Sequence, residues 1–190
     1  MTSGLIGFIA TPKQGNARPD GVTWCADNGC FSDKWDEASW WRFLVDNAGG
    51  AETCAFAVAP DVVGDAEATL ARSLPWLPKI RALGYPVALV GQDGMTPDQV
   101  PWDDIDAIFI GGSTEWKLGP AARALVTEAK ARGKWAHMGR VNSQRRYEYA
   151  RRIGCDSVDG TFLTFGPDVN LPKLLSWVRS ADQLLMEVPS

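Results

Sequence analysis

The chain has 190 residues, of which 45% are hydrophobic and 22% charged, a composition typical of a globular protein with a substantial core. The net charge of −4 excludes a protein coated with positive charge for general nucleic-acid binding, but leaves room for a local basic patch. No apolar run approaches the roughly 20 residues of a membrane span, so no membrane partner is predicted. The length indicates one domain over residues 1–190.

Cysteine and histidine usage limits the chemistry. The four cysteines are scattered without a C-x-x-C pair, and His137 is the only histidine. A structural zinc site is therefore not expected, and no cofactor is predicted. A Ser-His-Asp or Cys-His enzyme would have to use His137, and no signature surrounds a serine or cysteine to support it. Free thiols, and an N-terminus without a secretory pattern, predict a cytoplasmic protein.

Short β-rich runs alternate with helical patterns along the chain. Strands are expected at 4–10, 22–26, 53–60, 86–91, 107–112, 134–139 and 156–161. Helices are expected at 35–48, 65–84, 119–133, 142–154 and 170–185, with Pro75 and Pro78 kinking the second. This alternation predicts βαβ units and a parallel sheet.

The number of strands favours a barrel. Seven strands are clear, and there is room for one short strand that the pattern does not place. A (β/α) barrel needs eight strands and typically about 250 residues. We therefore expect an α/β fold that is a compact or incomplete (β/α)8 TIM-type barrel of parallel strands.

Polar residues and glycines follow the predicted strands. They are Asp27, Asp61, Gln92 with Asp93, Gly111 with Gly112 and Ser113, Gly139 with Arg140, and Asp156 with Asp159. Each turn alone has a structural explanation, because Asp before a helix is usually an N-cap and glycine permits a bend. In a parallel α/β fold, however, all these positions converge on the face where ligands bind. The sequence therefore predicts a site at the carboxyl ends of the strands.

The residue types at these ends suit recognition of a flat, polar ring. Two carboxylates and a glutamine can pair with the donors and acceptor of a guanine-like edge, and a Gly-Gly pair lets backbone N–H groups approach a carbonyl oxygen. Phe31 and Met138 could sandwich the ring between an aromatic and a thioether group. A further carboxylate on the sugar side could attack an anomeric carbon, as in retaining glycosyl transfer.

The order of these turns resembles the tRNA-guanine transglycosylase family, the queuine-inserting base-exchange enzymes. Six segments carry the resemblance: Asp27–Ser32, Pro60-Asp61, Val90–Gly94, Gly111–Thr114, Met138–Val141 and Gly154–Gly160. Each motif alone is weak, but their order after successive strands makes the set fairly specific. The resemblance covers roughly residues 22–165.

The resemblance implies roles for individual residues. Asp159 would be the nucleophile that forms a covalent glycosyl-enzyme intermediate, and Asp27 would contact the base and handle its proton. The base edge would be read by Asp61, Gln92 and the backbone of Gly111 and Gly112, with Phe31 and Met138 stacking on the ring. Asp156 would orient the strand end, and the alternative that it is the nucleophile remains open.

The chain also departs from the family pattern. The family's zinc module is absent, as is its basic Pro-Thr-Arg segment, where Thr161–Thr164 stands instead. The chain is about half the usual family length. It therefore resembles more closely a branch, often virus-encoded, that exchanges guanine in DNA for 7-deazaguanine derivatives. That branch implies a nucleic acid, DNA rather than tRNA, and a free 7-deazaguanine base as partners, in a host cytoplasm if the protein comes from a phage.

A basic cluster follows the sixth strand, with Arg140, Arg145, Arg146, Arg151 and Arg152 within 13 residues. Such a helix can have a merely solvated face. Beside a nucleic-acid site, Arg140, Arg145 and Arg146 are expected to contact backbone phosphates, which position a strand without reading its sequence.

Two other functions remain open. A hydrolase of the same architecture would cleave an N-glycosidic bond with water in place of the incoming base. A non-catalytic protein could keep the purine pocket to bind a nucleotide or nucleobase. Whether the chain forms a homodimer is also left open.

Overall fold

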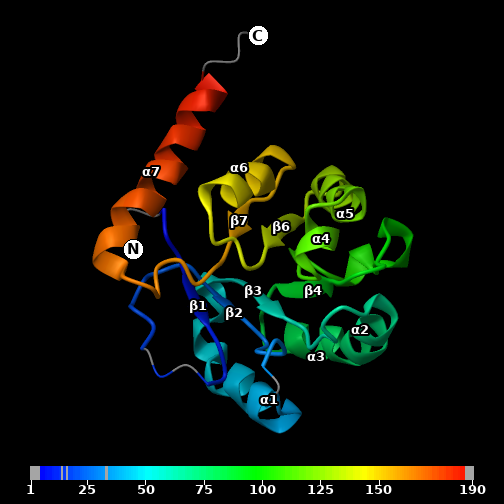
Figure 1. Ribbon diagram of the computed structural model, residues 1–190. Helices are drawn as coiled ribbons and strands as arrows, with labels where there is room; N and C mark the ends of the chain where they lie inside the picture. Colours follow the sequence, from blue (N-terminus) through cyan, green and yellow to red (C-terminus); the bar gives the residue numbers. More distant parts are fainter. Residues whose placement is uncertain (1–4, 14, 16, 33, 187–190) are drawn as a thin grey trace.

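The computed structural model describes residues 5–13, 15, 17–32 and 34–186, with side chains through residue 180. Its centre is one parallel sheet in which each strand pairs with the next in sequence, from β1 to β7 (Figure 1). The strands are β1 (Phe8–Ala10), β2 (Trp24–Ala26), β3 (Cys54–Val58), β4 (Val87–Gly91), β5 (Ala107–Ile110), β6 (Trp135–Met138) and β7 (Ser157–Val158). All seven predicted strands are present.

The sheet curls into a partial barrel. Sequential parallel pairing with helical crossovers is the arrangement of a (β/α) barrel, and β1 and β7 form the two ends of the strand order. The described residues contain no eighth strand to join them. The expected incomplete TIM-type barrel is confirmed, and the carboxyl ends of all seven strands lie at one edge.

Helices cover the outer side of the curled sheet (Figure 1). They are α1 (Glu37–Asp46), α2 (Ala66–Ser73), α3 (Leu77–Ala82), α4 (Thr114–Lys117), α5 (Pro120–Ala131), α6 (Gln144–Arg152) and α7 (Pro167–Met186). The predicted 65–84 helix is broken at the 3₁₀ segment Leu74–Trp76, as its prolines indicated. The short α4 was not predicted. None of the described helices is long and apolar enough to cross a membrane.

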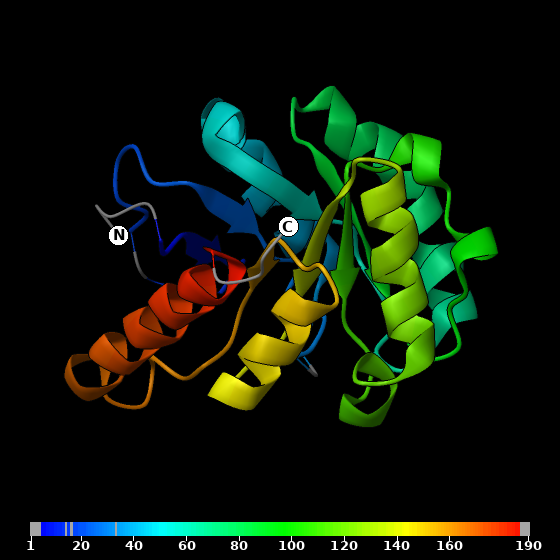
Figure 2. The ribbon, with the colours of Figure 1, turned by 90° about the horizontal axis from the view of Figure 1, so that it is seen from above.

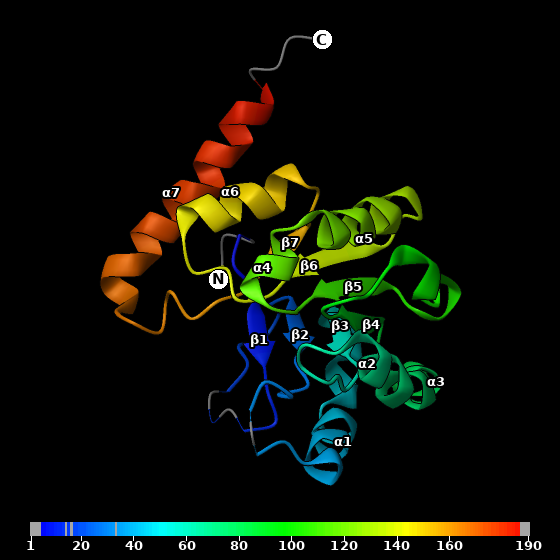
Figure 3. The same cartoon turned by 45° about the vertical axis from the view of Figure 1, so that its right-hand side comes forward.

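Side-chain oxygens cap several helices. Asp36 accepts from Ser39 N–H at 2.7 Å, and Asp65 accepts from Ala68 N–H at 2.9 Å. Asp65 is therefore an N-cap, in agreement with the structural explanation of its position. The last helix, α7, lies beside α6 and extends away from the rest of the molecule (Figures 2 and 3).

The core has two layers because both faces of the sheet are buried. Val87 and Leu89 of β4 pack toward the helices, whereas Ala88 and Val90 pack inside the curl. The inner cluster is completed by Phe56, Val58, Ala107 and Phe109. Burial on both faces explains the nearly continuous apolar runs of the strands. The inner cluster therefore lies on the face of the sheet opposite the helices.

Candidate functional site at the carboxyl ends of the strands

Asp159 follows β7 and is hydrogen-bonded to the histidine of β6. His137 Nε2 lies 3.0 Å from Asp159 Oδ2, and the His137 ring packs on Phe56 and Phe109. Its other nitrogen, Nδ1, lies 2.7 Å from Ser157 Oγ. His137 therefore joins the inner core of the barrel to a carboxylate at its mouth.

A surface tryptophan extends this set of hydrogen bonds. Trp135 Nε1–H donates to Ser157 Oγ at 2.8 Å, and an indole N–H can only donate. The Ser157 hydroxyl can then donate its hydrogen to His137 Nδ1. A hydrogen on His137 Nε2 is donated to the Asp159 carboxylate, which when ionised can only accept.

Arg140 supplies a second donor to Asp159. Its backbone N–H lies 2.9 Å from Asp159 Oδ1. Arg140 has φ 59°, the only positive φ of a non-glycine residue in the described part of the chain. Gly139 precedes it without a side chain, and a Cβ there would lie 2.7 Å from the Phe109 ring. Backbone strain and a close approach thus aim this N–H at the carboxylate.

Asp159 is held ionised by its surroundings. Burial acts to raise its pKa, but the hydrogen bond and charge of His137, the N–H of Arg140 and the charge of Lys117 outweigh burial. The pKa of Asp159 therefore lies below its usual value. An anionic carboxylate with hydrogen-bond support suits nucleophilic attack.

Lys117 is a buried cation that the sequence did not single out. It lies in α4, only 1% of it is exposed, and its Nζ donates to the Gly139 carbonyl at 2.7 Å. Burial, and secondarily the charge of Arg140, lower the Lys117 pKa to about 8. The sequence signal that could have identified Lys117 was a lysine five residues after the Gly-Gly pair that ends a strand.

Asp27 has the opposite electrostatic setting. It follows β2, and Gly29 N–H donates to its Oδ1 at 2.6 Å. Burial raises the Asp27 pKa to about 6 against the effect of that hydrogen bond, and the charges of Asp159 and Asp61 raise it further. Asp27 can therefore hold or release a proton near neutral pH.

Asp61 and Gln92 brace the strand ends internally. Gln92 Nε2–H donates to Asp61 Oδ2, and Asn28 Nδ2–H donates to Asp61 Oδ1 at 2.8 Å. Gln92 Oε1 accepts from Gly64 and Gly112 N–H, both at 2.9 Å. This network joins the segments that follow β2, β3, β4 and β5. Direct base contacts by Asp61 and Gln92 remain a prediction that would require some of these bonds to be exchanged.

The backbone N–H groups of the Gly-Gly turn also have partners within the protein. Gly111 N–H donates to Gly91 O, and Gly112 N–H donates to Gln92 Oε1. Their role is close packing, since a Cβ on Gly111 would lie 2.7 Å from Val90. The expectation that these N–H groups point at a ligand carbonyl does not fit this structure.

An aromatic ring and a guanidinium group meet at the mouth of the site. Phe31 is 68% exposed, and the Arg140 guanidinium carbon lies 4.7 Å from its ring centre. Arg140 Nη2–H also donates to the Gly112 carbonyl. Phe31 is thus available to stack, whereas Arg140 belongs to the site mouth.

Two other residues singled out in the sequence lie away from the candidate site. Met138 is completely buried between sheet and helices, so its predicted stacking role is wrong. The reason is strand alternation, which turns His137 inward and Met138 outward. Asp156 precedes β7, pairs with Lys130 at 2.6 Å and accepts from Ala136 N–H, so it holds the opposite end of the strand. Asp156 therefore lies outside the candidate site, and the nucleophilic role of Asp159 stays a prediction.

The remaining basic residues lie on α6. Arg145 is exposed and Arg146 is half-buried, with its charge close enough to affect Lys117. The described residues contain no cluster of His, Cys, Asp or Glu that could hold a metal ion.

Comparisons with known proteins establish the fold alone. No protein-family model and no curated protein matches the chain. The Amycolatopsis orientalis BexX/CysO complex contains a chain 16% identical, with a TM-score of 0.58, covering 100% of this chain and 85% of that one. Tryptophan synthase from M. tuberculosis is 14% identical, with a TM-score of 0.52, covering 84% and 59%.

A third solved structure is more distant. The PaMucR phosphodiesterase in its c-di-GMP complex is 15% identical, with a TM-score of 0.46, covering 74% of this chain. This chain spans about three fifths of the phosphodiesterase and tryptophan synthase chains, at 60% and 59%. None of these three named proteins is a tRNA-guanine transglycosylase.

Proposed function

We propose that this protein is a base-exchange transglycosylase that replaces guanine in a nucleic acid, DNA rather than tRNA, with a 7-deazaguanine derivative. One observation carries the proposal: two carboxylates at the strand ends have pKa values displaced in opposite directions, Asp159 downward and Asp27 up to about 6. Such a division separates a nucleophile from an acid/base group.

The proposed first step breaks the glycosidic bond. The Asp159 carboxylate attacks the anomeric carbon of the nucleotide and forms a glycosyl ester, while protonated Asp27 gives its proton to the departing guanine. His137 and the Arg140 N–H hold Asp159 in position through its two oxygens. The donated proton and the displaced bonding electrons leave together with the base.

The second step reverses this chemistry with the new base. Asp27, now ionised, takes a proton from a ring nitrogen of the 7-deazaguanine derivative, and that nitrogen attacks the glycosyl ester. Asp159 is released as carboxylate, so no net proton is gained or lost. The exposed Phe31 ring offers a stacking face for the base.

The test is one incubation of the protein with labelled guanine or a 7-deazaguanine and duplex DNA, single-stranded DNA or tRNA. Label incorporation and an adduct that survives a denaturing gel support the proposal. Release of guanine that leaves an abasic strand, without incorporation, would make the protein a hydrolase. Tight binding of the base without turnover on any polymer would make it a binding protein.

A further inference from the structure

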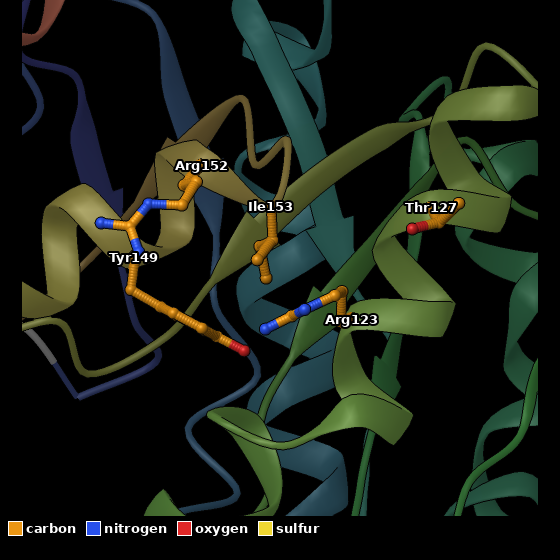
Figure 4. A pocket seen from close by; sticks show the side chains of 5 residues that line it. All are labelled: Arg123, Thr127, Tyr149, Arg152 and Ile153. Atoms are coloured by element: carbon orange, nitrogen blue, oxygen red, sulfur yellow. The ribbon is translucent and has the colours of Figure 1, made fainter.

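A cavity lies in the helix layer, outside the sheet, between α5 and α6 (Figure 4). Its volume is about 380 Å³, near the lower end of the roughly 300–1,000 Å³ typical of ligand pockets. The lining residues are Arg123, Thr127, Tyr149, Arg152 and Ile153. None of them belongs to the strand-end site, and none is acidic.

One buried polar group of this cavity lacks a hydrogen-bond partner. The Tyr149 hydroxyl is shielded from solvent and makes no hydrogen bond in the described part of the chain. Figure 4 shows this hydroxyl and the guanidinium end of Arg123 pointing toward one another, whereas the Arg152 guanidinium lies near the backbone end of the Tyr149 side chain. A buried hydroxyl without a partner is destabilising, and a bound acceptor would supply the missing hydrogen bond.

Neither Arg123 nor Arg152 forms an ion pair with another described residue, although the chain has 23 acidic residues against 19 Lys and Arg. The carboxylates available on and after these helices are engaged elsewhere. Glu128 pairs with Arg132, and Asp156 pairs with Lys130, both at 2.6 Å. Glu148 accepts from Gln144 at 2.9 Å. Arg123 therefore brings an unpaired positive charge to an unpartnered hydroxyl, and Arg152 adds a second positive charge to the cavity lining.

We propose that the cavity between α5 and α6 binds a phosphate group, held between the Arg123 guanidinium and the Tyr149 hydroxyl, with Arg152 and the Thr127 hydroxyl at its edge. Several oxygens on one tetrahedral anion can accept from a planar guanidinium fork and from hydroxyl donors together. The site is independent of the proposed transglycosylase activity. The phosphate can belong to a nucleic-acid backbone or to a free phosphate.

The test is a titration with inorganic phosphate, followed by calorimetry and by ³¹P line broadening at constant ionic strength. We expect saturable binding in the millimolar range. Arg123→Ala should weaken binding about tenfold or more, and Tyr149→Phe, which removes one hydroxyl, about threefold or more. Arg42→Ala, an exposed arginine on α1, is the matched control and should bind as the wild type does.

A second arm identifies the source of the phosphate. If it is a backbone phosphate, a short single-stranded oligonucleotide displaces inorganic phosphate, and Arg123→Ala lowers the oligonucleotide's affinity. If it is free phosphate, the oligonucleotide does not compete. Asp159→Asn should leave phosphate binding intact whether or not the protein exchanges bases. No saturable phosphate binding, or binding unchanged in both Arg123→Ala and Tyr149→Phe, would overturn the proposal.

Discussion

His137 Nε2 lies 3.0 Å from Asp159 Oδ2, and this contact is the inner end of a hydrogen-bond chain that runs from Trp135 through Ser157. The exposed indole orders the serine hydroxyl, the hydroxyl orders the imidazole, and the imidazole orders the carboxylate. The chain explains how a carboxylate with only 20% of its side chain exposed stays anionic. These hydrogen bonds also give His137, the only histidine in the sequence, a defined role beyond packing.

Replacing this histidine should shift the pH dependence of base exchange. His137→Phe retains a ring against Phe56 and Phe109 but removes the hydrogen bond and charge that lower the Asp159 pKa. Since Asp159 must be ionised to attack, the acid limb of kcat/KM should move to higher pH. The profile is measured from about pH 4 to 9. An acid limb in the wild-type position would show that His137 does not govern Asp159.

A smaller shift is expected for Ser157→Ala. This variant leaves His137 in place but removes the partner of Nδ1. Its acid limb should therefore lie between those of the wild type and His137→Phe. A shift as large as that of His137→Phe would indicate that the ring itself had moved.

Asp27 should make the protein less stable at neutral than at acidic pH. Its folded pKa of about 6 lies above the ordinary value of 3.8, so the folded state holds the proton more tightly than the unfolded state. The contribution of Asp27 to stability therefore falls as pH rises from about 4 to 6 and stays low above that range. The cost of the ionised form is on the order of 2–3 kcal/mol.

Asp27→Asn should remove this cost. The variant should unfold at a higher temperature than the wild type at pH 7, and the difference should vanish near pH 4, while base exchange is lost. Asp65→Asn is the matched control, because asparagine caps a helix as well as aspartate does. If the wild type unfolded at a higher temperature than Asp27→Asn at pH 7, the raised pKa of Asp27 would be contradicted.

The hydrogen-bond network of Gln92 and Asp61 predicts that Gln92 stabilises the folded protein. Gln92→Ala removes three hydrogen bonds and leaves Asp61 and two backbone N–H groups without that partner. The free energy of unfolding should fall by about 2–4 kcal/mol in chemical denaturation. Gln99→Ala, in an exposed capping box, should cost about 1 kcal/mol or less. Unchanged stability with a raised KM for the base would favour the original base-reading role.

The basic residues of α6 are expected to grip a nucleic-acid backbone. Arg145→Ala/Arg146→Ala should lower affinity for DNA and reduce the slope of log affinity against log salt by about 1 to 2. Arg42→Ala/Arg179→Ala removes two exposed arginines from α1 and α7 and is the control. An unchanged salt slope in the α6 variant would show that the nucleic-acid backbone does not contact Arg145 and Arg146.

The sequence predicted the fold well because its signals are repeated. Seven apolar runs separated by capped helical patterns determine a parallel sheet even though each strand is shorter than predicted. The strand ends then bring Asp27 and Asp159 close enough for their charges to interact. Parallel topology alone predicts that convergence.

The side-chain directions and hydrogen-bond partners within the site could not be predicted in the same way. The inward and outward alternation of β6 depends on one residue of register, so the sequence assigns Met138 to the site, whereas in the structure it is His137 that contacts Asp159. Gln92 and Asp61 carry side chains that could hydrogen-bond a ligand, but only the three-dimensional structure reveals that they hydrogen-bond each other. The burial of Lys117 likewise depends on a four-residue helix that no periodic pattern marks.

The most direct test of the central claim is the fate of Asp159→Asn in the labelled-base assay with a denaturing gel. The variant should retain the fold by circular dichroism, form no covalent adduct and exchange base at least about 10³-fold more slowly than the wild type. Asp156→Asn, which alters the carboxylate at the opposite end of β7, should still form the adduct and exchange base. Exchange by Asp159→Asn at a near wild-type rate, or an adduct on that variant, would contradict the assignment of Asp159 as nucleophile.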